Sequence, residues 1–256
     1  ENHSFVTRGD VDAAIAHKRH RSNLAEHWIQ DEIKEGTLMV DLDGDVVGQV
    51  NGLSVHQLGD YSFGRPTRIT ARTYVGTKGV IDVQREAELA GNIHSKGVLT
   101  LAGYLAGKFA GLHPFAMNAS LTFEQTYSEI EGDSAAVAEL TAILSSLADL
   151  PIRQYLAVTG SVNQLGEVQP IGGVNEKIEG FLESCSRRGL TGKQGVIIPA
   201  RNTKHLALRR DVVEAVESGQ FTVYAVNTLE EAIELLTGVA AGERGIDGEY
   251  PPDTVF

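Results

Sequence analysis

EGDSAA (residues 131–136) and PIGGVNEK (residues 170–177) open and close the stretch that decides the fold of this chain. Ser134 lies in the first segment and Lys177 in the second, 43 residues apart, each at the start of a helix-like run. A serine hydroxyl is a poor nucleophile until a nearby base takes its proton. A lysine amine can be that base when burial or a helix N-terminus lowers its pKa. These residue types lead to the central hypothesis of a Ser–Lys peptidase.

Ser134 is expected at a turn between a strand and a helix. Backbone N–H groups of the first helical turn would there favour the oxyanion that forms when a hydroxyl adds to a peptide carbonyl. The alternative is that Asp133 or Ser134 only caps the helix, the commonest role for either residue type at that place. Lys177 follows two glycines, and a helix dipole disfavours an ammonium in the first turn. Its alternative is an ordinary exposed lysine.

Other catalytic patterns fit less well. A trypsin-like Gly-Asp-Ser triplet continues with two glycines, and the α/β-hydrolase elbow needs glycine on both sides of the serine, whereas Ala135 and Ala136 follow here. The eight histidines lie in no telling context, so we expect surface histidines without a metal site. A Ser–His–Asp hydrolase is a distant alternative. Gly107-Lys108-Phe109 lacks the neighbours of a phosphate-binding loop, so no ATP site of that kind is expected.

The N-terminal half is expected to be rich in strands after an initial helix. Helical spacing predicts a helix from Asp10 to Gly36. Short apolar runs between Thr37 and Thr77 predict antiparallel strands, with Asp43-Gly44 and Asn51-Gly52 as hairpin signals. Strand and helix then follow one another in the second half of the chain, which is typical of α/β construction.

Further elements are predicted along the chain from periodicity and breakers. They are a helix from Lys96 to Gly111 with a stripe at Gly103, Gly107 and Gly111, a strand from Leu121 to Tyr127, a helix from Ser134 to Pro151, a strand from Tyr155 to Thr159, a helix from Asn175 to Gly189, strands at Gly195–Pro199 and Phe221–Val226, and helices around Val212–Val216 and Leu229–Leu236. The glycine stripe favours close helix packing. The expected class is mixed α/β.

Composition limits the partners. Of the 256 residues, 42% are hydrophobic and 22% are charged, which is ordinary for a globular protein. The net charge of −12 argues against nucleic acid or an anionic membrane as a partner. No apolar run is long enough for a membrane span, and the single cysteine, Cys185, fits a reducing, cytoplasmic compartment. The chain begins at Glu1, so we expect it to be a piece of a longer protein.

The two segments that open and close the central stretch resemble the signature segments of the proteolytic domain of Lon proteases. They are more similar to the LonB-type branch than to the LonA form, whose serine segment usually reads P-K-D-G-P-S-A-G. Gly48–Leu53 and Val158–Val162 agree with the same family, and the resemblance covers roughly Thr37 to Gly238.

The resemblance implies a Lon proteolytic-domain fold in which Ser134 is the nucleophile and Lys177 the general base. Thr159 matches a family threonine near the lysine amine, and it is a supporting candidate together with Asp133. The resemblance also implies a homo-hexameric ring, unfolded or damaged cytoplasmic proteins as substrates, and an AAA+ ATPase module before the peptidase domain. ATP and Mg would belong to that module, and we expect no cofactor or metal in this fragment.

The expected domain organisation has three parts. Residues 1–36 would be a helical linker or the end of the missing ATPase module, residues 37–238 the Ser–Lys peptidase domain, and residues 239–256 a poorly ordered tail rich in Gly, Pro and acid. An alternative function is a Lon-like scaffold or ring-forming module without turnover. The presence of both Ser134 and Lys177 counts against it, because a scaffold needs neither.

Overall fold

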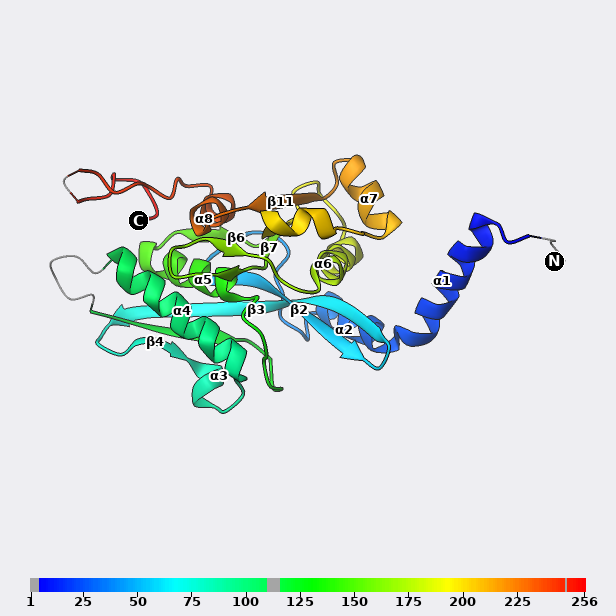
Figure 1. The fold of residues 1–256 in the computed structure, drawn as a ribbon, viewed down its shortest axis with the longest axis horizontal. Coiled ribbons are helices and arrows are strands. Elements are labelled where there is room, and N and C mark those ends of the chain that lie inside the picture. Colours follow the sequence, from blue (N-terminus) through cyan, green and yellow to red (C-terminus); the bar gives the residue numbers. More distant parts are fainter. Residues whose placement is uncertain (1–4, 110–115, 247) are drawn as a thin grey trace.

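A mixed β-sheet runs through the molecule (Figure 1). The computed structural model describes residues 5–109, 116–246 and 248–256. Among these, seven strands form the large sheet in the order β11-β10-β7-β2-β3-β5-β4. Their bounds are β2 Gln49–Leu58, β3 Tyr61–Val75, β4 Gly79–Asp82, β5 Met117–Phe123, β7 Leu156–Val158, β10 Gly195–Pro199 and β11 Thr222–Val226. The β11-β10-β7-β2 pairs and the β5-β4 pair are parallel, whereas β2-β3-β5 are antiparallel.

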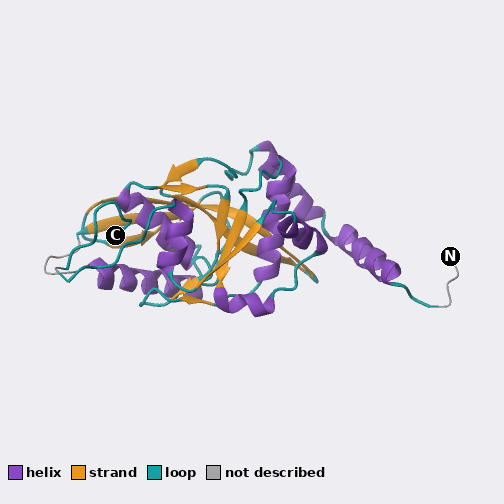
Figure 2. Ribbon diagram, turned by 90° about the horizontal axis from the view of Figure 1, so that it is seen from above, coloured by secondary structure: helices purple, strands orange, loops and turns teal. Residues whose placement is uncertain are grey.

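Helices cover both faces of this sheet (Figure 2). The described helices are α1 Arg8–Ser22, α2 Leu24–Glu35, α3 Val83–Glu86, α4 Asn92–Phe109, α5 Ala136–Ala148, α6 Val174–Arg188, α7 Arg210–Glu217 and α8 Leu229–Thr237, with a 3₁₀ turn at Ala200–His205. Two small antiparallel sheets pair β1 (Asp45–Val47) with β6 (Pro151–Arg153) and β8 (Ser161–Val162) with β9 (Val168–Gln169). The predicted mixed α/β class is confirmed.

The core has two parts, one on each face of the sheet. In β10, Val196 and Ile198 belong to the cluster formed with α2, α6 and α7, whereas Ile197 belongs to the cluster formed with α4, α5 and α8. Successive side chains of a strand point to opposite faces, so a strand buried on both sides is apolar throughout. Helix α5 is buried on every side from Ala136 to Ser145, which fixes the turn that precedes it.

The two hairpin predictions are wrong. Asn51-Gly52 lies inside β2, and the β2–β3 hairpin turns at Gly59-Asp60. A Cβ at Gly52 would lie 2.5 Å from Cδ1 of Ile69, so this glycine makes room for close packing across the sheet and does not form a turn. Asp43-Gly44 is a bend before β1, whose partner is the distant β6.

The predicted helix from Asp10 to Gly36 is two helices, broken at Asn23. Helix α1 buries none of its residues and extends away from the sheet (Figure 1), whereas α2 packs on α6 and buries Ile33 in the core. Residues 1–36, expected as one linker, therefore contain an exposed helix followed by a packed one.

Helix α4 begins four residues earlier than predicted and, within the described residues, extends to Phe109. Gly111 of the predicted glycine stripe lies outside the described residues. A Cβ at Gly103 would meet the side chain of Gln164 at 2.5 Å, whereas one at Gly107 would meet nothing, so the close packing involves Gly103. The strand predicted to reach Tyr127 ends at Phe123.

The C-terminal residues 239–256 have no helix or strand in their described part, yet they pack back on the body. Ala241 and Val255 are buried in the α5 and α8 side of the core, and the Val255 N–H donates to the Ala240 carbonyl at 3.0 Å. This packing differs from the expectation of a poorly ordered tail, because the apolar residues at its end find a place in the core.

Candidate active site

Ser134 lies in the turn that leads from β5 into α5. The N-cap of α5 is Ala135, and no side chain caps the helix, so the alternative that Asp133 or Ser134 serves as the cap is wrong. The Ala136 N–H donates to the Asp133 carbonyl at 3.1 Å, and the Val137 N–H donates to the Gly160 carbonyl at 3.0 Å. These bonds hold the turn against the segment that carries Thr159, and they leave the Ser134 side chain without a structural role at the helix end.

Lys177 is in the first turn of α6, as predicted, and its residue is only 3% exposed. Gly173 caps this helix with a φ of 65°, a backbone conformation that glycine adopts without strain. The helix lies directly on β3: a Cβ at Gly64 would be 2.0 Å from the carbonyl oxygen of Glu176, and one at Gly180 would be 2.0 Å from the carbonyl oxygen of Gly64. Glycines on both elements thus bring the first turn of α6 close to the sheet.

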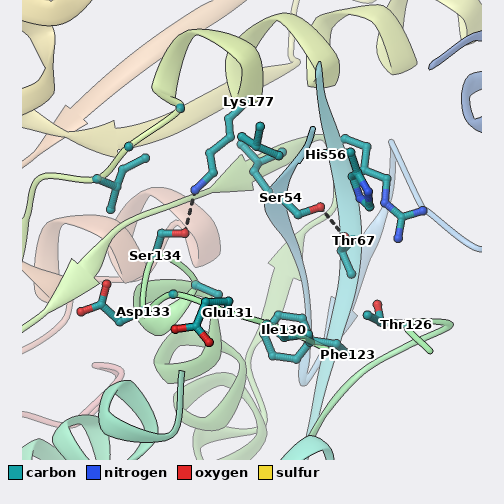
Figure 3. Close-up of a pocket in the computed structure, with 18 of the residues that line it drawn as sticks. Ser54, His56, Thr67, Phe123, Thr126, Ile130, Glu131, Asp133, Ser134 and Lys177 are labelled. Atoms are coloured by element: carbon teal, nitrogen blue, oxygen red, sulfur yellow. Dashed lines mark hydrogen bonds between the residues drawn. The ribbon is translucent and has the colours of Figure 1, made fainter. Parts of the chain in front are cut away.

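The structure brings Ser134 and Lys177 together (Figure 3), and Thr159 lies beside the same lysine. Lys177 Nζ lies 2.7 Å from Ser134 Oγ and 3.0 Å from Thr159 Oγ1, within hydrogen-bond distance of both. The Thr159 hydroxyl donates to the carbonyl of Ser134 at 3.0 Å, while its backbone N–H donates to Ile197 of β10 at 3.0 Å. Thr159 therefore links the serine turn to the end of the central sheet and meets the lysine amine.

Burial lowers the pKa of Lys177 to about 8, while the charge of Asp133 opposes this shift. An amine with that pKa is about half neutral near pH 8 and about one tenth neutral near pH 7, and the neutral form can accept a proton from the hydroxyl beside it. Asp133, predicted as a supporting residue, accepts a hydrogen bond from Ser161 Oγ at 2.9 Å. Ser161 had no role in the sequence analysis, because a hydroxyl two residues after Thr159 carries no motif of its own.

The N-terminal end of α4 holds the loop before Ser134. The Gly91 N–H donates to the Ile130 carbonyl at 2.9 Å, and the Ile93 N–H donates to Glu131 Oε1 at 3.3 Å. A Cβ at Gly97 would lie 3.0 Å from the Cβ of Asp133, so the second turn of α4 approaches the serine turn closely. The loop is therefore supported along its length by one helix.

A buried cluster of three titratable side chains lies between β4, α4 and α5. His94 Nε2 is 3.1 Å from Asp82 Oδ2, and His94 Nδ1 is 3.7 Å from Glu139 Oε1. The expectation of surface histidines is wrong for His94, which is 1% exposed. The hydrogen bond to Asp82 and the charge of Glu139 outweigh burial and raise the pKa of His94, while burial raises the pKa of Glu139 to about 7. No spacing rule links these three positions, so the sequence analysis missed them.

A groove of about 630 Å³ opens beside Ser134 and Lys177. β7 pairs with β2 only at Asn51 and Gly52, so the edge of β2 beyond Gly52 has no partner strand among the described residues. The groove is lined by Leu53, Ser54, Val55, His56, Gln57, Arg65, Thr67, Phe123, Thr126, Ser128, Glu129, Ile130, Glu131, Gly132, Asp133, Ser134, Ala135, Pro170, Ile171, Gly172, Gly173 and Lys177. An open strand edge beside a nucleophile is suited to an extended peptide.

Residues 128–238 match the Lon protease (S16) C-terminal proteolytic domain, the region that includes Ser134 and Lys177. The chain carries a proteolytic domain of the Lon protease family. A Lon protease homolog from Escherichia coli (strain K12) is 47% identical over 224 residues, which are 87% of this chain and 38% of the relative. A homolog from Haemophilus influenzae is 46% identical over 217 residues, or 84% of this chain and 36% of the relative. The archaeal Lon protease of Thermococcus kodakarensis is 32% identical over 234 residues, or 90% of this chain and 34% of the relative.

The predicted Lon resemblance is thus confirmed, including its relation to the archaeal, LonB-type proteins. The chain spans little more than a third of the length of these curated relatives. None of the described helices has the length and apolar character that crossing a membrane requires. The described residues also contain no group of three or more His, Cys, Asp or Glu side chains arranged to hold a metal ion.

Proposed function

We propose that this Lon domain is a serine endopeptidase in which Ser134 is the nucleophile and Lys177 is the general base. The observation that carries this proposal is the 2.7 Å distance between Lys177 Nζ and Ser134 Oγ at a groove open to substrate. A general base must also be able to lose its own proton. Burial provides this, because it lowers the pKa of Lys177 to about 8 and so populates the neutral amine.

In the first step, the Ser134 hydroxyl adds to the carbonyl carbon of the scissile bond while Lys177 takes its proton. The carbonyl oxygen becomes an oxyanion near the N-terminal end of α5. The N–H groups of Ala136 and Val137 already have backbone acceptors, whereas those of Ser134 and Ala135 have none among the described residues. The last two are therefore the proposed oxyanion donors, rather than the first helical turn as a whole.

In the second step, the Lys177 ammonium donates its proton to the leaving amine as the peptide bond breaks, which leaves an ester on Ser134. Water then attacks this ester, with Lys177 again as the base, and the free acid and the Ser134 hydroxyl are formed. Asp133 lies near enough for its charge to favour the ammonium that forms in each half-reaction. Thr159 positions the amine by accepting one of its hydrogens, which aims the lone pair at Ser134.

The substrate is proposed to bind as an extended chain along the open edge of β2. Residues 53–57 line the groove there, and an added strand would obtain backbone hydrogen bonds that do not depend on sequence. A folded protein does not present such a strand. We therefore propose unfolded or damaged proteins as substrates.

The assembly around this domain is also a proposal. We infer a homo-hexameric ring in the cytoplasm with an AAA+ module, which would hold ATP and Mg and deliver unfolded chains. This proposal is supported by family membership and by the length of the relatives, of which this chain spans a little more than a third. We propose no membrane or nucleic-acid partner, and no cofactor held by this domain itself.

Cleavage of an unstructured casein substrate by the full-length parent protein tests the proposal. Ser134→Ala and Lys177→Ala are each expected to abolish cleavage while circular dichroism and oligomeric mass stay unchanged. The matched control is Ser186→Ala, on the surface of α6. If Lys177→Ala keeps near-full activity while a histidine substitution removes it, the lysine is not the base. If the wild-type protein, joined to its ATPase, is inactive on every unfolded substrate, the scaffold alternative replaces this proposal.

A further inference from the structure

Two arginines of β3, Arg65 and Arg68, have different surroundings. Arg68 Nη2 forms an ion pair with Asp41 Oδ2 at 2.9 Å. Arg65 forms no hydrogen bond or ion pair through its side chain with any residue that the structure describes, and its Nε is fully enclosed. Glu32 influences Arg65 electrostatically but is too far away for an ion pair. The hydrogen-bonding capacity of the Arg65 guanidinium is therefore unmet within the described chain.

Burial lowers the pKa of Arg65, and the charge of Glu32 opposes the shift. A guanidinium remains protonated in proteins even so, because its ordinary pKa is very high. The Arg65 side chain is half-buried, and its Nε is enclosed without an acceptor, as Nε of Arg68 is. An enclosed donor without an acceptor is unfavourable, and an anion at this guanidinium would form charge-assisted hydrogen bonds with it. Arg65 is thus prepared to receive an anion.

Arg65 lines the groove that contains Ser134 and Lys177. It lies opposite Ser54 in the β2–β3 ladder, so Ser54, His56 and Arg65 share one face of the hairpin. Burial and the charge of Arg65 lower the pKa of His56 to about 4, so this imidazole is neutral at pH 7. A single positive charge with a neutral hydrogen-bonding neighbour therefore forms this side of the groove.

The acidic groups of the groove lie on the loop before α5. They are Glu129, Glu131 and Asp133, and in Figure 3 Asp133 and His56 lie on opposite sides of the site. Glu131 accepts from the Ile93 N–H and Asp133 accepts from Ser161, so both have donors within the protein. Lys177 meets the hydroxyls of Ser134 and Thr159. Glu129 has no protein partner among the described residues but is exposed to water, so Arg65 is the half-buried charge of the groove for which those residues provide no hydrogen-bond acceptor.

We propose that Arg65 is a specificity residue that binds an acidic side chain of the peptide substrate at one position near the scissile bond. This inference rests on the proposed endopeptidase function and adds the class of peptide that it prefers. An extended substrate beside β2 directs alternate side chains to the face that Ser54, His56 and Arg65 share, so the preference is confined to one register. The planar guanidinium can bind both oxygens of a glutamate or aspartate side chain.

The test uses the full-length parent protein and a library of unstructured peptides, with cleavage sites read by mass spectrometry. A matched pair of peptides then carries glutamate or glutamine at the enriched position. The glutamate peptide is expected to have about tenfold or greater kcat/KM, as a charge-assisted hydrogen bond implies. Arg65→Gln removes the preference, and Arg65→Glu shifts it towards lysine. Arg72→Gln, on an exposed arginine of the same strand outside the groove, leaves it unchanged.

Several results would overturn the inference. Equal cleavage of the two peptides by the wild-type protein, or a preference that survives in Arg65→Gln, removes the subsite while the endopeptidase function stands. A change of oligomeric mass in Arg65→Gln with an unchanged preference assigns the arginine to contacts between copies instead. If Arg65→Gln does not fold, the rates at which the wild-type protein cleaves the glutamate and glutamine peptides still test whether an acidic side chain is preferred. No cleavage of any peptide by the wild-type protein would remove the proposed function itself.

Discussion

Helix α5 lies beside two buried groups of polar side chains that use burial in opposite ways. Ser134, Lys177 and Thr159 meet just before its first turn, and one side of this site opens into the groove. Glu139, within the first turn, joins a second cluster with Asp82 and His94, and these residues are 1%, 0% and 1% exposed. The first group is accessible to a peptide, and the second is sealed.

The difference lies in the charges that surround each group. Lys177 has two hydroxyls as neighbours, so burial dominates and lowers its pKa to about 8. The imidazole of His94 has a carboxyl group on each side, so its charged form is favoured in spite of burial. A buried amine next to hydroxyls can become a neutral base, whereas a buried imidazole between carboxyl groups favours its charged form and links three elements.

The two groups therefore respond to pH with opposite signs. His94 and Glu139 have raised pKa values in the folded state, so the cluster takes up protons on folding and its contribution is lost as pH rises through those values. Lys177 has a lowered pKa, so it releases a proton on folding between about pH 8 and its ordinary value near 10.5. Substitutions in each group can separate these contributions.

The largest expected effect is on the sealed cluster. His94→Leu leaves the carboxyl group of Asp82 buried without the imidazole that pairs with it, and breaking a buried pair in this way costs about 3–5 kcal/mol. The free energy of unfolding, measured by urea titration near pH 6, is expected to fall by that amount. His17→Leu, on the exposed helix α1, is the control and is expected to change little. A loss below about 1 kcal/mol would mean that the cluster contributes no more than a surface ion pair.

The next effect is the contribution of Lys177 to the pH dependence of stability. Because its pKa falls from 10.5 to about 8 on folding, the wild-type protein is expected to gain about 3 kcal/mol of stability relative to Lys177→Met between pH 8 and 10.5. Urea titrations of both proteins across this range measure the difference. Lys193→Met, which removes an exposed lysine, is the control and should run parallel to the wild type. Parallel curves for Lys177→Met as well would show that the amine is not perturbed by burial.

The sequence allowed both residues of the proposed dyad to be predicted, because each lies in a short pattern with its own chemical meaning. Ser134 and Lys177 are each next to a helix start, and glycines mark the turn before each helix. That the two side chains meet depends on the packing of α6 on β3 through Gly64 and Gly180, which no local pattern contains. Only the likeness to a known family supplied that step.

Two other features could not be predicted for related physical reasons. Asp82, His94 and Glu139 come from three separate elements, so their cluster exists only after the chain has folded. Asn51-Gly52 has the composition of a tight turn, but Gly52 makes room for the side chain of Ile69 in the middle of a strand. A glycine that makes room for a neighbour and a glycine that allows a turn are identical in the sequence.

The smallest expected effect tests how the open site is positioned. Thr159 Oγ1 lies 3.0 Å from Lys177 Nζ and also donates to the Ser134 carbonyl, so Thr159→Val removes two hydrogen bonds from a nearly isosteric side chain. When the amine is neutral, its lone pair must point to the Ser134 hydroxyl, and the bond to Thr159 favours that orientation. We expect kcat for a casein peptide to fall about tenfold, equivalent to one such bond to a charged group, with little change in KM.

Two further measurements separate this positioning role of the Thr159 hydroxyl from a purely structural role of the side chain. In Thr159→Val, the Lys177 ammonium loses a hydrogen-bond acceptor, which disfavours the charged form and lowers the pKa of Lys177. The rise of kcat with pH should therefore move to lower pH. Thr159→Ser, which keeps the hydroxyl and removes the methyl group, should restore both kcat and the profile. If Thr159→Ser is as slow as Thr159→Val, packing of the methyl group at the end of β7 matters more than the hydroxyl. The open site would then resemble the sealed cluster, in which side chains act by holding elements in place.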